Sequence, residues 1–536
     1  MKLSELLLGV RIKGKMPETE VFGISTDSQN VKKGDLFICI KGGRADGHDY
    51  ARLALDTGAA LVLAERMPHD VEKARVILTE DTRKAASVAW YNFYGRPADG
   101  MTKIAVTGTA GKTSVAFILR ELLLSSGRRV GVVTTIRAMS GTRTLELGEN
   151  GGSSVNGVSG AMTTPDPEYF WYAAAEMKKD GCDTVIYEAS SQSLLRKAVS
   201  AVTPDLCIFT NLSEEHMDAH GTMENYFSTK AGLLEGVKNA VVNVDDEYFS
   251  RLPDMFRSCN FIRVSARREN AGKTEVCALR YHSMGENGTE YVYFSEKAVF
   301  RVLSRQIGFY SVYNTMEAAA AAIFLGADPM TVQEVLASFD GVDGRMYRVR
   351  YRGNEDKQAE LLPSVFIDYA HTPKALEYAC RALWEIKNSK SDGEHKFIVM
   401  FGCGGDRDKT KRPLMAMSAQ KYADMTVITN DNPRNEEPEK IISDILTGVD
   451  KEKPYTVIPD RRAAIKYAIE YAGAGDIVLL AGKGHEKYEI TSRGMEPFDE
   501  EITACAGIIK NRILFVCSSA LRMDFGRNNN ERRPQT

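Results

Sequence analysis

The sequence predicts an α/β protein of three domains in which the sheets are mostly parallel. The chain has 536 residues, which is too long for a single hydrophobic core. Short apolar stretches typical of buried strands recur along it, and nearly every one ends in a cluster of polar residues. Over residues 103–135 the pattern is strand, glycine loop, amphipathic helix, strand, and such a βαβ unit implies a parallel sheet.

Three blocks of strand and helix patterns divide the chain. Residues 1–99 are predicted to form a small N-terminal α/β domain, residues 100–344 a central domain and residues 345–511 a C-terminal domain. Two stretches are typical of loops. Residues 138–161 are rich in Gly and Ser, and residues 512–536 form a basic tail that we expect to be disordered.

The composition is that of an ordinary globular protein, with 43% hydrophobic and 26% charged residues. A net charge of -3 without a large basic block argues against a nucleic-acid partner. The nine cysteines never form a CxxC pair, which argues against a zinc site and favours a reducing cytosol. No stretch approaches the ~20 apolar residues of a membrane span. We therefore expect a cytoplasmic protein without nucleic-acid or membrane partners, and we expect it to be a monomer.

The stretch "VTGTAGKTSV" is a candidate phosphate-binding loop of unusual length. The usual loop has four residues between its two glycines, whereas only two residues separate Gly108 from Gly111. Backbone N–H groups and the N-terminus of the next helix would bind phosphate oxygens, with Lys112 on the β- and γ-phosphates and Thr113 on Mg²⁺. A chance Gly-Lys-Thr turn is the alternative, and the strand–loop–helix context argues against it.

Two polar clusters follow other strands of the central block. They are candidate site residues, because ligands in open α/β sheets bind beyond the carboxyl ends of the strands. Glu188 ends the strand "TVIYE", and its carboxylate is either a second Mg²⁺ ligand or the cap of the next helix. The segment "TNLSEEHMDAHGTMENYFSTK" holds His216, Asp218, His220 and Lys230, which indicates a metal and acid–base cluster or a solvated loop. For His220 we favour the solvated loop.

The C-terminal block carries candidate sites for an anion and for a zwitterion. The segment "GCGGDRDKTKRPLM" is basic directly after a strand, which suits an anionic ligand, although basic helix starts are usually only solvated. Asn432, Arg434 and Glu486 follow two further strands; the arginine would bind a carboxylate and the glutamate an ammonium group. Asp368 and His371 end another strand, where contact with phosphate or a role as base is favoured.

In chain order, these motifs resemble the Mur ligase family. The matching motifs, over about residues 20–505, are GxxGKT, TTP, ExSS, the TNL…H…HGTMExYF…K segment, NxDD, GxxGRM, DYAHTP, GCGGDRD, DNPR and GKGHE. The closest branch adds the third residue to UDP-N-acetylmuramoyl-L-alanyl-D-glutamate in peptidoglycan precursor synthesis. The resemblance implies a central domain of P-loop ATPase type, a Rossmann-like C-terminal domain and a small N-terminal α/β domain. It also implies that ATP phosphorylates a carboxylate and that an amine attacks the acyl phosphate to form an amide.

The resemblance also implies roles in the ATP chemistry. The expected catalytic residues are Lys112, Glu188, His216 and Lys230. The expected Mg²⁺ ligands are Thr113, Glu188, His216 and Lys230, the last as a CO₂-derived carbamate (N6-carboxylysine), which turns a cation into an anion. The expected ATP-binding residues are Gly108, Thr109, Ala110, Gly111, Lys112, Thr113, Ser114, Asn314, Arg345, Asp368 and His371.

Two substrate pockets are implied in the same way. Expected contacts to the UDP-muramoyl-peptide are Ser28, Gly47, His48, Thr163, Thr164, Ser190 and Arg196. The expected amino-acid pocket consists of Arg407, Asp431, Asn432, Pro433, Arg434, Gly482 and Glu486. The Asn-Pro-Arg form goes with meso-diaminopimelate, whose distal carboxylate Arg434 would bind; L-lysine would leave a buried arginine without a partner, which is costly.

Departures from the family pattern lie mainly in the acceptor pocket. Gln192 replaces the usual His, Gln29 replaces an Arg, and Ala198 stands where a substrate-binding Arg is expected, with Arg196 two residues earlier. Three functions therefore stay open. The first is a ligase that joins meso-diaminopimelate to UDP-N-acetylmuramoyl-L-alanyl-D-glutamate, and the intact ATP motifs favour it. The second is a Mur-type paralogue with a different carboxylate acceptor or with L-lysine as the amine, and the third is a non-catalytic nucleotide-binding regulator.

Overall fold

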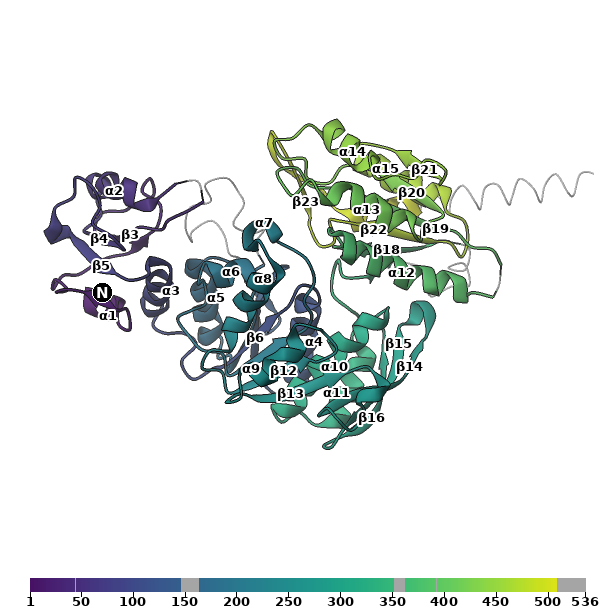
Figure 1. The fold of residues 1–536 in the computed structure, drawn as a ribbon, viewed down its shortest axis with the longest axis horizontal. Coiled ribbons are helices and arrows are strands. Elements are labelled where there is room, and N and C mark those ends of the chain that lie inside the picture. Colours follow the sequence, from purple (N-terminus) through teal and green to yellow (C-terminus); the bar gives the residue numbers. More distant parts are fainter. Residues whose placement is uncertain (44, 146–162, 351–361, 392, 509–536) are drawn as a thin grey trace, which may run out of the picture. The chain divides into compact units, whose positions relative to one another are not determined.

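The computed structural model describes residues 1–43, 45–145, 163–350, 362–391 and 393–508 (Figure 1). Two compact units divide the chain. Unit 1 comprises Met1–Arg280, Tyr291–Val302 and Val312–Phe339, and unit 2 comprises Tyr281–Glu290, Leu303–Ser311 and Asp340–Thr536. The predicted tail at 512–536 lies outside the described residues. The domain limits predicted from the sequence stay a prediction.

Unit 1 begins with a five-stranded sheet in the order β1-β5-β4-β3-β2. All its strand pairs are parallel except β1 with β5. The elements are β1 (Ile12–Lys13), β2 (Ile24–Ser25), β3 (Leu36–Ile38), β4 (Leu61–Ala64) and β5 (Val76–Thr79), with α1 (Leu3–Leu6), α2 (Ala51–Thr57) and α3 (Thr82–Phe93).

An eleven-stranded sheet follows in unit 1, in the order β16-β15-β14-β13-β12-β11-β6-β10-β7-β8-β9. The central strand β6 (Thr102–Thr107) runs parallel to both neighbours, β10 (Thr184–Glu188) and β11 (Leu206–Phe209). Their carboxyl ends therefore meet at one edge of the sheet. The remaining strands are β7 (Val130–Val133), β8 (Ala138–Ser140), β9 (Arg143–Leu145), β12 (Asn239–Asn243), β13 (Asn260–Ser265), β14 (Val276–Ser283), β15 (Thr289–Ser295) and β16 (Val299–Ser304).

The predicted amphipathic helix after the glycine loop is α4 (Lys112–Ser125), which packs on β6, β7 and β10. Its apolar side chains, from Val115 to Leu123, are buried against the sheet. Gly127 takes a left-handed φ of +83° directly after the helix, as expected for a C-terminal glycine. The other helices of this region are α5 (Pro167–Lys179), α6 (Ser191–Leu195), α7 (Met217–His220), α8 (Met223–Ala231), α9 (Leu252–Met255), α10 (Phe309–Phe324) and α11 (Pro329–Ser338).

The prediction of a loop over residues 138–161 is wrong at its beginning. Strands β8 and β9 form an antiparallel hairpin that extends the sheet from β7. Ala138, Ser140 and Leu145 are buried there, so the segment gains both ladder hydrogen bonds and apolar burial. The high Gly and Ser content farther along obscured this short strand signal. Residues 146–161 lie outside the described residues.

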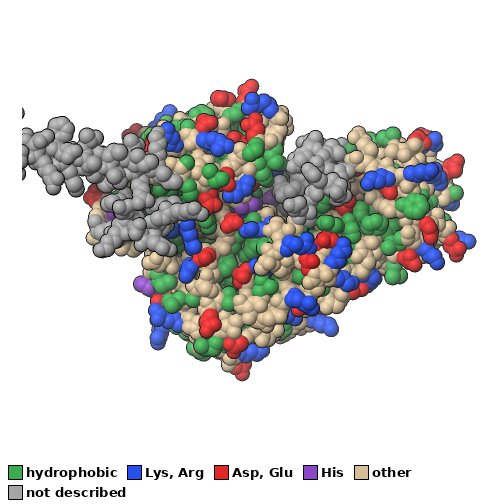
Figure 2. All heavy atoms as spheres, turned by 180° about the vertical axis from the view of Figure 1, so that it is seen from behind, with side chains coloured by type: hydrophobic (Ala, Val, Ile, Leu, Met, Phe, Trp, Pro, Cys, Tyr) green, Lys and Arg blue, Asp and Glu red, His purple; other side chains and the backbone are tan. Residues whose placement is uncertain are grey.

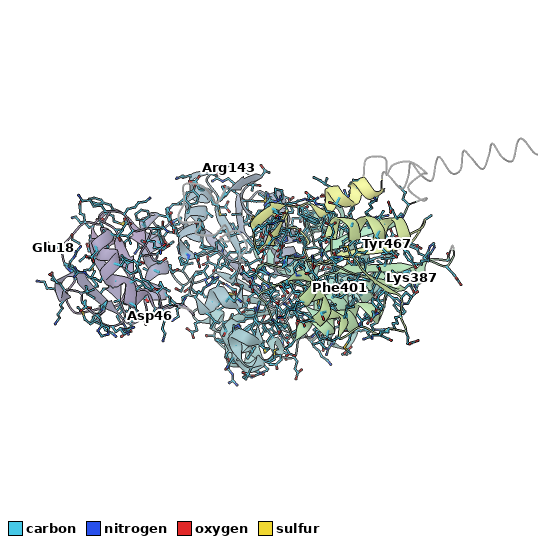
Figure 3. All side chains as sticks on the ribbon, turned by 90° about the horizontal axis from the view of Figure 1, so that it is seen from above. Glu18, Asp46, Arg143, Lys387, Phe401 and Tyr467 are labelled. Atoms are coloured by element: carbon cyan, nitrogen blue, oxygen red, sulfur yellow. The ribbon has the colours of Figure 1, made fainter. Side chains whose placement is uncertain are left out.

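Unit 2 holds a six-stranded sheet in the order β17-β18-β22-β19-β20-β21, which is parallel apart from β17. Alternate residues of β19 face opposite layers. Phe397, Val399 and Phe401, the last labelled in Figure 3, pack with α12, α13 and α14, whereas Ile398 and Met400 pack with α15. Helices on both faces of a parallel sheet confirm the predicted α/β class.

The strands expected before the polar clusters of the C-terminal block are β18, β19, β20 and β22. The strands are β17 (Tyr347–Arg348), β18 (Ser364–Asp368), β19 (Phe397–Phe401), β20 (Met425–Ile428), β21 (Tyr455–Val457) and β22 (Ile477–Ala481), followed by the hairpin β23 (Tyr488–Thr491) and β24 (Gly494–Pro497). The helices are α12 (Pro373–Ser389), α13 (Lys411–Gln420), α14 (Pro438–Leu446) and α15 (Arg461–Tyr471).

The surface agrees with the mixed charge composition. On the face in Figure 2, positive and negative side chains are interspersed, and neither sign covers a large area. In the described part of the chain, none of the helices combines the length and the apolar character that crossing a bilayer requires.

Glu317 of α10 is a buried carboxyl group that is expected to lower the stability of the fold. Its side chain is fully buried, and within the described residues neither carboxyl oxygen has a hydrogen bond. Burial, with a smaller contribution from the Asp246 carboxylate, raises the pKa of Glu317 well above its ordinary value. Because the folded-state pKa is raised, the folded protein binds more protons than the unfolded chain, and stability falls as pH rises above the ordinary carboxyl range.

We therefore predict that Glu317→Met raises the free energy of unfolding at neutral pH by about 1–3 kcal/mol. The gain should be larger at about pH 8 than at about pH 5, as measured by urea denaturation. Glu334, exposed on α11, is the matched control, and Glu334→Met should change stability little. A loss of stability in Glu317→Met, or a gain independent of pH, would contradict the prediction.

Candidate active site

The glycine loop joins β6 to α4 and contacts two neighbouring elements closely. Gly108 and Gly111 have φ values of +149° and +86°. A Cβ atom on Gly108 would lie 1.9 Å from Oγ1 of Thr210, and one on Gly111 would lie 2.4 Å from Oδ1 of Asn314. The predicted ATP-binding residue Asn314 therefore packs directly on the loop, and both glycines are required by backbone shape and by space.

Backbone and side-chain groups beyond β11 hold the loop in place. The N–H of Thr109 donates to the carbonyl of Asn211 at 2.7 Å, and the N–H of Ala110 donates to Asn211 Oδ1 at 3.0 Å. Lys112 donates from Nζ to the carbonyls of Gly108 and Thr109, at 3.0 and 2.7 Å. The ammonium group therefore lies at the loop, near the N-terminus of α4, where anionic oxygens are favoured.

Glu188 at the end of β10 faces this helix N-terminus. Its Oε1 accepts hydrogen bonds from Thr113 Oγ1 at 2.8 Å and from the N–H of Thr135 at 3.0 Å, and Oε2 accepts from Thr135 Oγ1 at 3.0 Å. The carboxylate is buried, with 1% exposure. The capping alternative for Glu188 is wrong, because the side chain of Ser190 caps α6 by accepting from the N–H of Ser193.

Lys230 of α8 is buried beside the same loop. Its Nζ donates to the carbonyl of Gly108 at 2.8 Å and lies 3.4 Å from Thr107 Oγ1. Burial, and next the ammonium of Lys112, hold the pKa of Lys230 well below its ordinary value, although Glu215 acts in the opposite direction. The side chain therefore loses its proton readily, and a neutral amine is a nucleophile.

The two histidines of the central cluster differ. His216 has a left-handed φ of +57° and is partly exposed, with Nε2 3.8 Å from a Glu215 carboxylate oxygen. His220 is buried and packs against the ring of Tyr226, with a centroid distance of 4.9 Å. The solvated-loop prediction for His220 is therefore wrong, because this ring fills space between α7 and α8.

The predicted Mg²⁺ ligands are brought together in part. Thr113 and Glu188 present oxygen atoms, the donor type that Mg²⁺ prefers, within one hydrogen-bonded cluster. Lys230 as an amine offers no oxygen, so it fits a cation site only after conversion to a carbamate. Among the described residues, no group of three or more His, Cys, Asp or Glu side chains could hold a metal ion.

Residues predicted to contact the acceptor lie before α5 and at both ends of α6, where Ser190 precedes the helix and Arg196 follows it. Thr164 is fully buried; its Oγ1 donates to the carbonyl of Glu188 at 2.6 Å and accepts from the N–H of Ser190 at 3.3 Å. Thr163 is partly exposed, and Arg196 lies 3.5 Å from the Asp166 carboxylate. Thr164 therefore fixes the position of Glu188 and Ser190, while Thr163 and Arg196 remain at the surface.

Ala198, where the resemblance places an arginine, is an interior position. Its side chain is fully buried, and its carbonyl accepts a hydrogen bond from Ser87 Oγ at 2.8 Å. The same Ser87 oxygen accepts from Trp171 Nε1 at 3.3 Å. Ser87 of α3 therefore links the backbone at Ala198 to Trp171 of α5.

Ser28, Gly47 and His48, also predicted to contact the UDP-muramoyl-peptide, lie in the N-terminal region. His48 is buried; its Nδ1 lies 2.6 Å from Asp46 Oδ1, and its Nε2 accepts from the N–H of Glu65 at 3.0 Å. A Cβ on Gly47 would lie 2.7 Å from the backbone nitrogen of Ile40, and Ser28 is buried. Both ring nitrogens of His48 are thus used within the domain.

In unit 2, the predicted amino-acid pocket forms around the end of β22. Asn432 donates from Nδ2 to Glu486 Oε2 at 2.8 Å. Burial, and then the negative charge of Asp431, raise the pKa of Glu486. Burial also acts to raise the pKa of Asp431, but Lys483, Arg461 and other cations outweigh it and lower that pKa. The pocket therefore holds closely spaced charges of both signs, as a zwitterion requires.

Arg434 lies in the same pocket with a left-handed φ of +53°. Its Nη1 donates to the carbonyls of Gly405 and Asn432, at 2.8 and 3.4 Å. Within the described residues, Nε and Nη2 have no hydrogen bond. A Cβ on Gly404 would lie 2.8 Å from Nη1, so this glycine leaves room for the guanidinium. The free edge of the group suits a carboxylate.

The other predicted residues of the amino-acid pocket differ in exposure. Pro433 is buried and precedes Arg434, and its carbonyl would lie 1.9 Å from a Cβ on Gly405. Gly482 has a φ of +116° and brings the backbone close to Asp431. Arg407 is exposed, and its Nη1 donates to the carbonyl of Asp406.

Asp368, Arg345 and His371 lie together near the end of β18 in unit 2. The Asp368 carboxylate accepts from the N–H groups of Met346 and Ala370, at 2.6 and 2.8 Å. Burial raises the pKa of Asp368, although Arg345 opposes the shift. The guanidinium of Arg345 stacks on Tyr369 at 4.5 Å, and the His371 ring packs on the same tyrosine. An aromatic surface beside a cation and a carboxylate suits a nucleoside.

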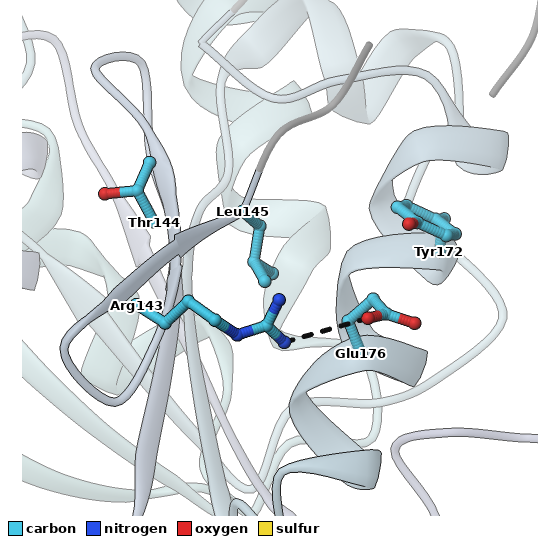
Figure 4. A pocket seen from close by; sticks show the side chains of 5 residues that line it. All are labelled: Arg143, Thr144, Leu145, Tyr172 and Glu176. Atoms are coloured by element: carbon cyan, nitrogen blue, oxygen red, sulfur yellow. Dashed lines mark ion pairs between the residues drawn. The ribbon is translucent and has the colours of Figure 1, made fainter. Parts of the chain in front are cut away.

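A cavity of about 320 Å³ contains none of the predicted site residues. It is lined by Arg143, Thr144, Leu145, Tyr172 and Glu176. Arg143 of β9 points toward Glu176 of α5, 3.7 Å away (Figure 4). The arginine and the carboxylate neutralise each other, so the cavity has no set of groups for the chemistry described above.

Comparison with known proteins decides the family. The chain matches the Mur ligase family, catalytic domain over residues 20–91, the Mur ligase middle domain over residues 106–322, and the Mur ligase, glutamate ligase domain over residues 344–484. A relative from Syntrophomonas wolfei subsp. wolfei is 34% identical over 531 residues, with 96% of this chain and 100% of the relative covered. The chain belongs to the Mur ligase family.

A second relative and one solved structure are also similar to this Mur ligase. A relative from Clostridioides difficile is 36% identical over 509 residues, which cover 94% of this chain and 99% of the relative. Both relatives carry the name UDP-N-acetylmuramoyl-L-alanyl-D-glutamate--2,6-diaminopimelate ligase. A solved structure of that ligase has a TM-score of 0.64 and 28% identity, covering 95% of this chain and 99% of the other.

Three residues of this Mur ligase site were missed from the sequence. Thr135 follows β7 and binds Glu188, Asn211 follows β11 and binds the glycine loop, and Lys483 is fully buried in the amino-acid pocket. The sequence pattern could have indicated all three, because each lies two residues after the end of an apolar strand. Lys483 also lies inside the quoted GKGHE motif.

The glycine loop of this Mur ligase allows a matched test. We predict that Gly111→Ala weakens ATP binding by more than about tenfold, because the added methyl group would displace Asn314. Gly127→Ala is the control, since Gly127 has a similar φ of +83° but nothing within 4 Å of its added Cβ. It should cost only about 1 kcal/mol of stability. Isothermal titration with an ATP analogue measures both, and equal affinities in the two variants would contradict the prediction.

Proposed function

We propose that this Mur ligase joins meso-diaminopimelate to the γ-carboxylate of UDP-N-acetylmuramoyl-L-alanyl-D-glutamate at the expense of ATP. The observation that carries the proposal is the cluster of Thr113, Glu188 and Lys230 around the glycine loop, in a chain aligned over its length with ligases of that name. The γ-phosphoryl group passes from ATP to a carboxylate oxygen. The neutral amine nitrogen then bonds to the carbonyl carbon and loses a proton, and phosphate leaves with that oxygen.

The phosphate-binding part of the ATP site belongs to unit 1, whereas Arg345, Asp368 and His371, which suit the nucleoside, belong to unit 2. Lys112 and the N–H groups at the N-terminus of α4 would bind the β- and γ-phosphates, and Thr113 and Glu188 would hold Mg²⁺. Bound Mg²⁺ supplies charge neutralisation for the transferred phosphoryl group. These groups are held in place before the reaction by Thr135, Asn211 and Asn314, so little reorganisation is needed.

The proposal includes carbamylation of Lys230. Its neutral Nζ forms a bond to the carbon of CO₂ and loses one proton, which leaves a carboxylate anion on the side chain. The depressed pKa and the burial beside Gly108 support this step, because a protonated amine has no free electron pair for it. The product would supply the oxygen that the amine lacks.

The amine half of the reaction belongs to unit 2. The Glu486 carboxylate, held by Asn432, would bind an ammonium group of the amino acid. The guanidinium edge of Arg434 would bind the distal carboxylate of meso-diaminopimelate. L-Lysine has no carboxylate there, so the pocket favours the dicarboxylic amino acid.

We also propose that the protein acts in the cytoplasm. The eight cysteines of the described residues are all free, although most of them are buried. This state supports a reducing compartment.

The experiment combines purified protein, ATP, Mg²⁺ and the muramoyl-dipeptide with either meso-diaminopimelate or L-lysine. A product of the mass of the meso-diaminopimelate adduct, in preference to the lysine adduct, is expected. A paralogue with another acceptor would give ADP with other carboxylates but none with the muramoyl-dipeptide. ATP binding without ADP formation on any acceptor would leave the regulator hypothesis.

A further inference from the structure

Lys483 is the one cation that contacts both Asn432 and Glu486 among the described residues of the amino-acid pocket. It follows β22 and has no exposed surface. Its Nζ donates to Asn432 Oδ1 at 2.8 Å and to the carbonyl of Tyr488 at 2.9 Å. The same nitrogen lies 3.5 Å from an Asp431 oxygen and 3.8 Å from a Glu486 oxygen. A buried ammonium with four oxygen neighbours is fixed in position.

These contacts fix the orientation of the Asn432 amide. The amide oxygen and nitrogen of an asparagine are assigned from hydrogen-bond partners. On one side of Asn432 lie two groups that can only donate, Lys483 Nζ at 2.8 Å and the N–H of Ile490 at 2.9 Å. That side must therefore be the oxygen. The amide nitrogen is consequently directed to Glu486, to which it donates at 2.8 Å.

The orientation has a consequence for Glu486. An ammonium ligand needs a carboxylate that is ionised and held at a fixed angle. With Asn432 reversed, an amide oxygen would face the Glu486 carboxylate, and two acceptors would repel each other. Lys483 and the N–H of Ile490 both oppose the reversed state by bonding the amide oxygen. Lys483 also places positive charge near Glu486, which favours the ionised carboxylate.

We propose that Lys483 is a positioning residue that sets the amide of Asn432 and thereby presents the Glu486 carboxylate to the ammonium group of the amino-acid substrate. The inference rests on the proposed function for the identity of that substrate. It extends the function by naming a side chain that determines amine affinity without touching the amine.

The test is the steady-state kinetics of Lys483→Met, a replacement of similar length without charge. KM for meso-diaminopimelate should rise by about tenfold or more, whereas KM for ATP and KM for the acceptor should stay within about twofold. Lys390→Met is the matched control. Lys390 is also a largely buried lysine of unit 2, bonded to Glu286 and to the carbonyl of Gly475, and no hydrogen bond or ion pair among the described residues links it to the pocket. It should leave all three KM values unchanged.

The acid side of the pH profile provides a second readout. The charged and titratable groups that face Glu486 are Asp431, Lys483, Arg434, Tyr369 and Tyr488. Lys483 acts to lower the pKa of Glu486, so its loss should raise that pKa further. The pH at which amine affinity falls should therefore move upward in Lys483→Met. A purely structural role would leave that pH unchanged.

A double-mutant cycle separates positioning from general damage. In an Asn432→Ala background, Lys483→Met should raise KM for the amine much less than in the wild type, since the amide that it orients is gone. Full additivity, or an unchanged amine KM in a folded Lys483→Met protein, would overturn the proposal.

If Lys483→Met has no cooperative melting transition, Lys483→Gln, which is shorter and uncharged but still polar, should give the same rise in KM for the amine. A wild-type enzyme without amide product would instead overturn the proposed function itself.

Discussion

Replacing Lys230 by alanine is expected to lower kcat by about 10²–10³-fold while ATP binding is largely kept. The side chain is buried against the carbonyl of Gly108, and its carbamate would supply negative charge and oxygen at the loop. Alanine removes that charge without removing Lys112 or the loop N–H groups. The measurement is ADP release under saturating substrates, together with the affinity for an ATP analogue.

A control for this result lies on the same sheet. Lys103 near the start of β6 forms an ion pair with Asp205 at 2.8 Å, at the end of the strand opposite to the glycine loop. Lys103→Ala should leave kcat within about twofold. Removal of dissolved CO₂ should also lower wild-type activity reversibly, whereas Lys230→Ala should not respond. Full turnover in a folded Lys230→Ala protein would contradict the role of this lysine.

Arg434→Ala is expected to lower kcat/KM for meso-diaminopimelate by about 100-fold, a loss of about 2–3 kcal/mol. Within the described part of the chain, the guanidinium is hydrogen-bonded through Nη1 alone, so its remaining edge is expected to bind the substrate. L-Lysine lacks the second carboxylate, and its much lower kcat/KM should therefore fall by far less. The preference between the two amines should shrink accordingly.

The preference for meso-diaminopimelate over L-lysine is measured with both amines in one reaction, and the two adducts are separated by mass. Arg381 on α12 is the control, because it is exposed and, among the residues that the structure describes, its side chain is bonded to Glu385 alone, at 2.9 Å. Arg381→Ala should keep the wild-type preference. An unchanged preference in the Arg434→Ala enzyme would contradict the prediction, because it would mean that another group binds the distal carboxylate.

Much of the fold could be predicted because its strands are short apolar runs bounded by polar residues. The segment "TVIYE" forms β10 over Thr184–Glu188, and the glycine loop lies between a strand and a helix as expected. The hairpin of β8 and β9 could not be predicted, since its strands have three residues each and stand beside a Gly- and Ser-rich segment. Pairing with β7 stabilises it, and that is a tertiary effect.

Site residues could be predicted where a local sequence motif indicates the role of a side chain. They could not be predicted where that role depends on contacts with residues distant in the sequence. Glu188 and Lys230 were expected at the loop, and the structure places both there. His220 was expected in solvent but packs on Tyr226, because contact across α7 and α8 cannot be read from a local pattern. Lys483 was overlooked, since an amide orientation is visible only when both of its donors are in place.

The most direct test of carboxylate activation follows oxygen atoms. The enzyme is given UDP-N-acetylmuramoyl-L-alanyl-D-glutamate labelled with ¹⁸O in its γ-carboxylate, together with ATP, Mg²⁺ and meso-diaminopimelate. Transfer of one labelled oxygen to inorganic phosphate for each amide formed is the predicted result, because the phosphate leaves with a carboxylate oxygen. Amide formation with unlabelled phosphate, or ADP release without label transfer, would contradict an acyl phosphate formed at the cluster of Thr113, Glu188 and Lys230.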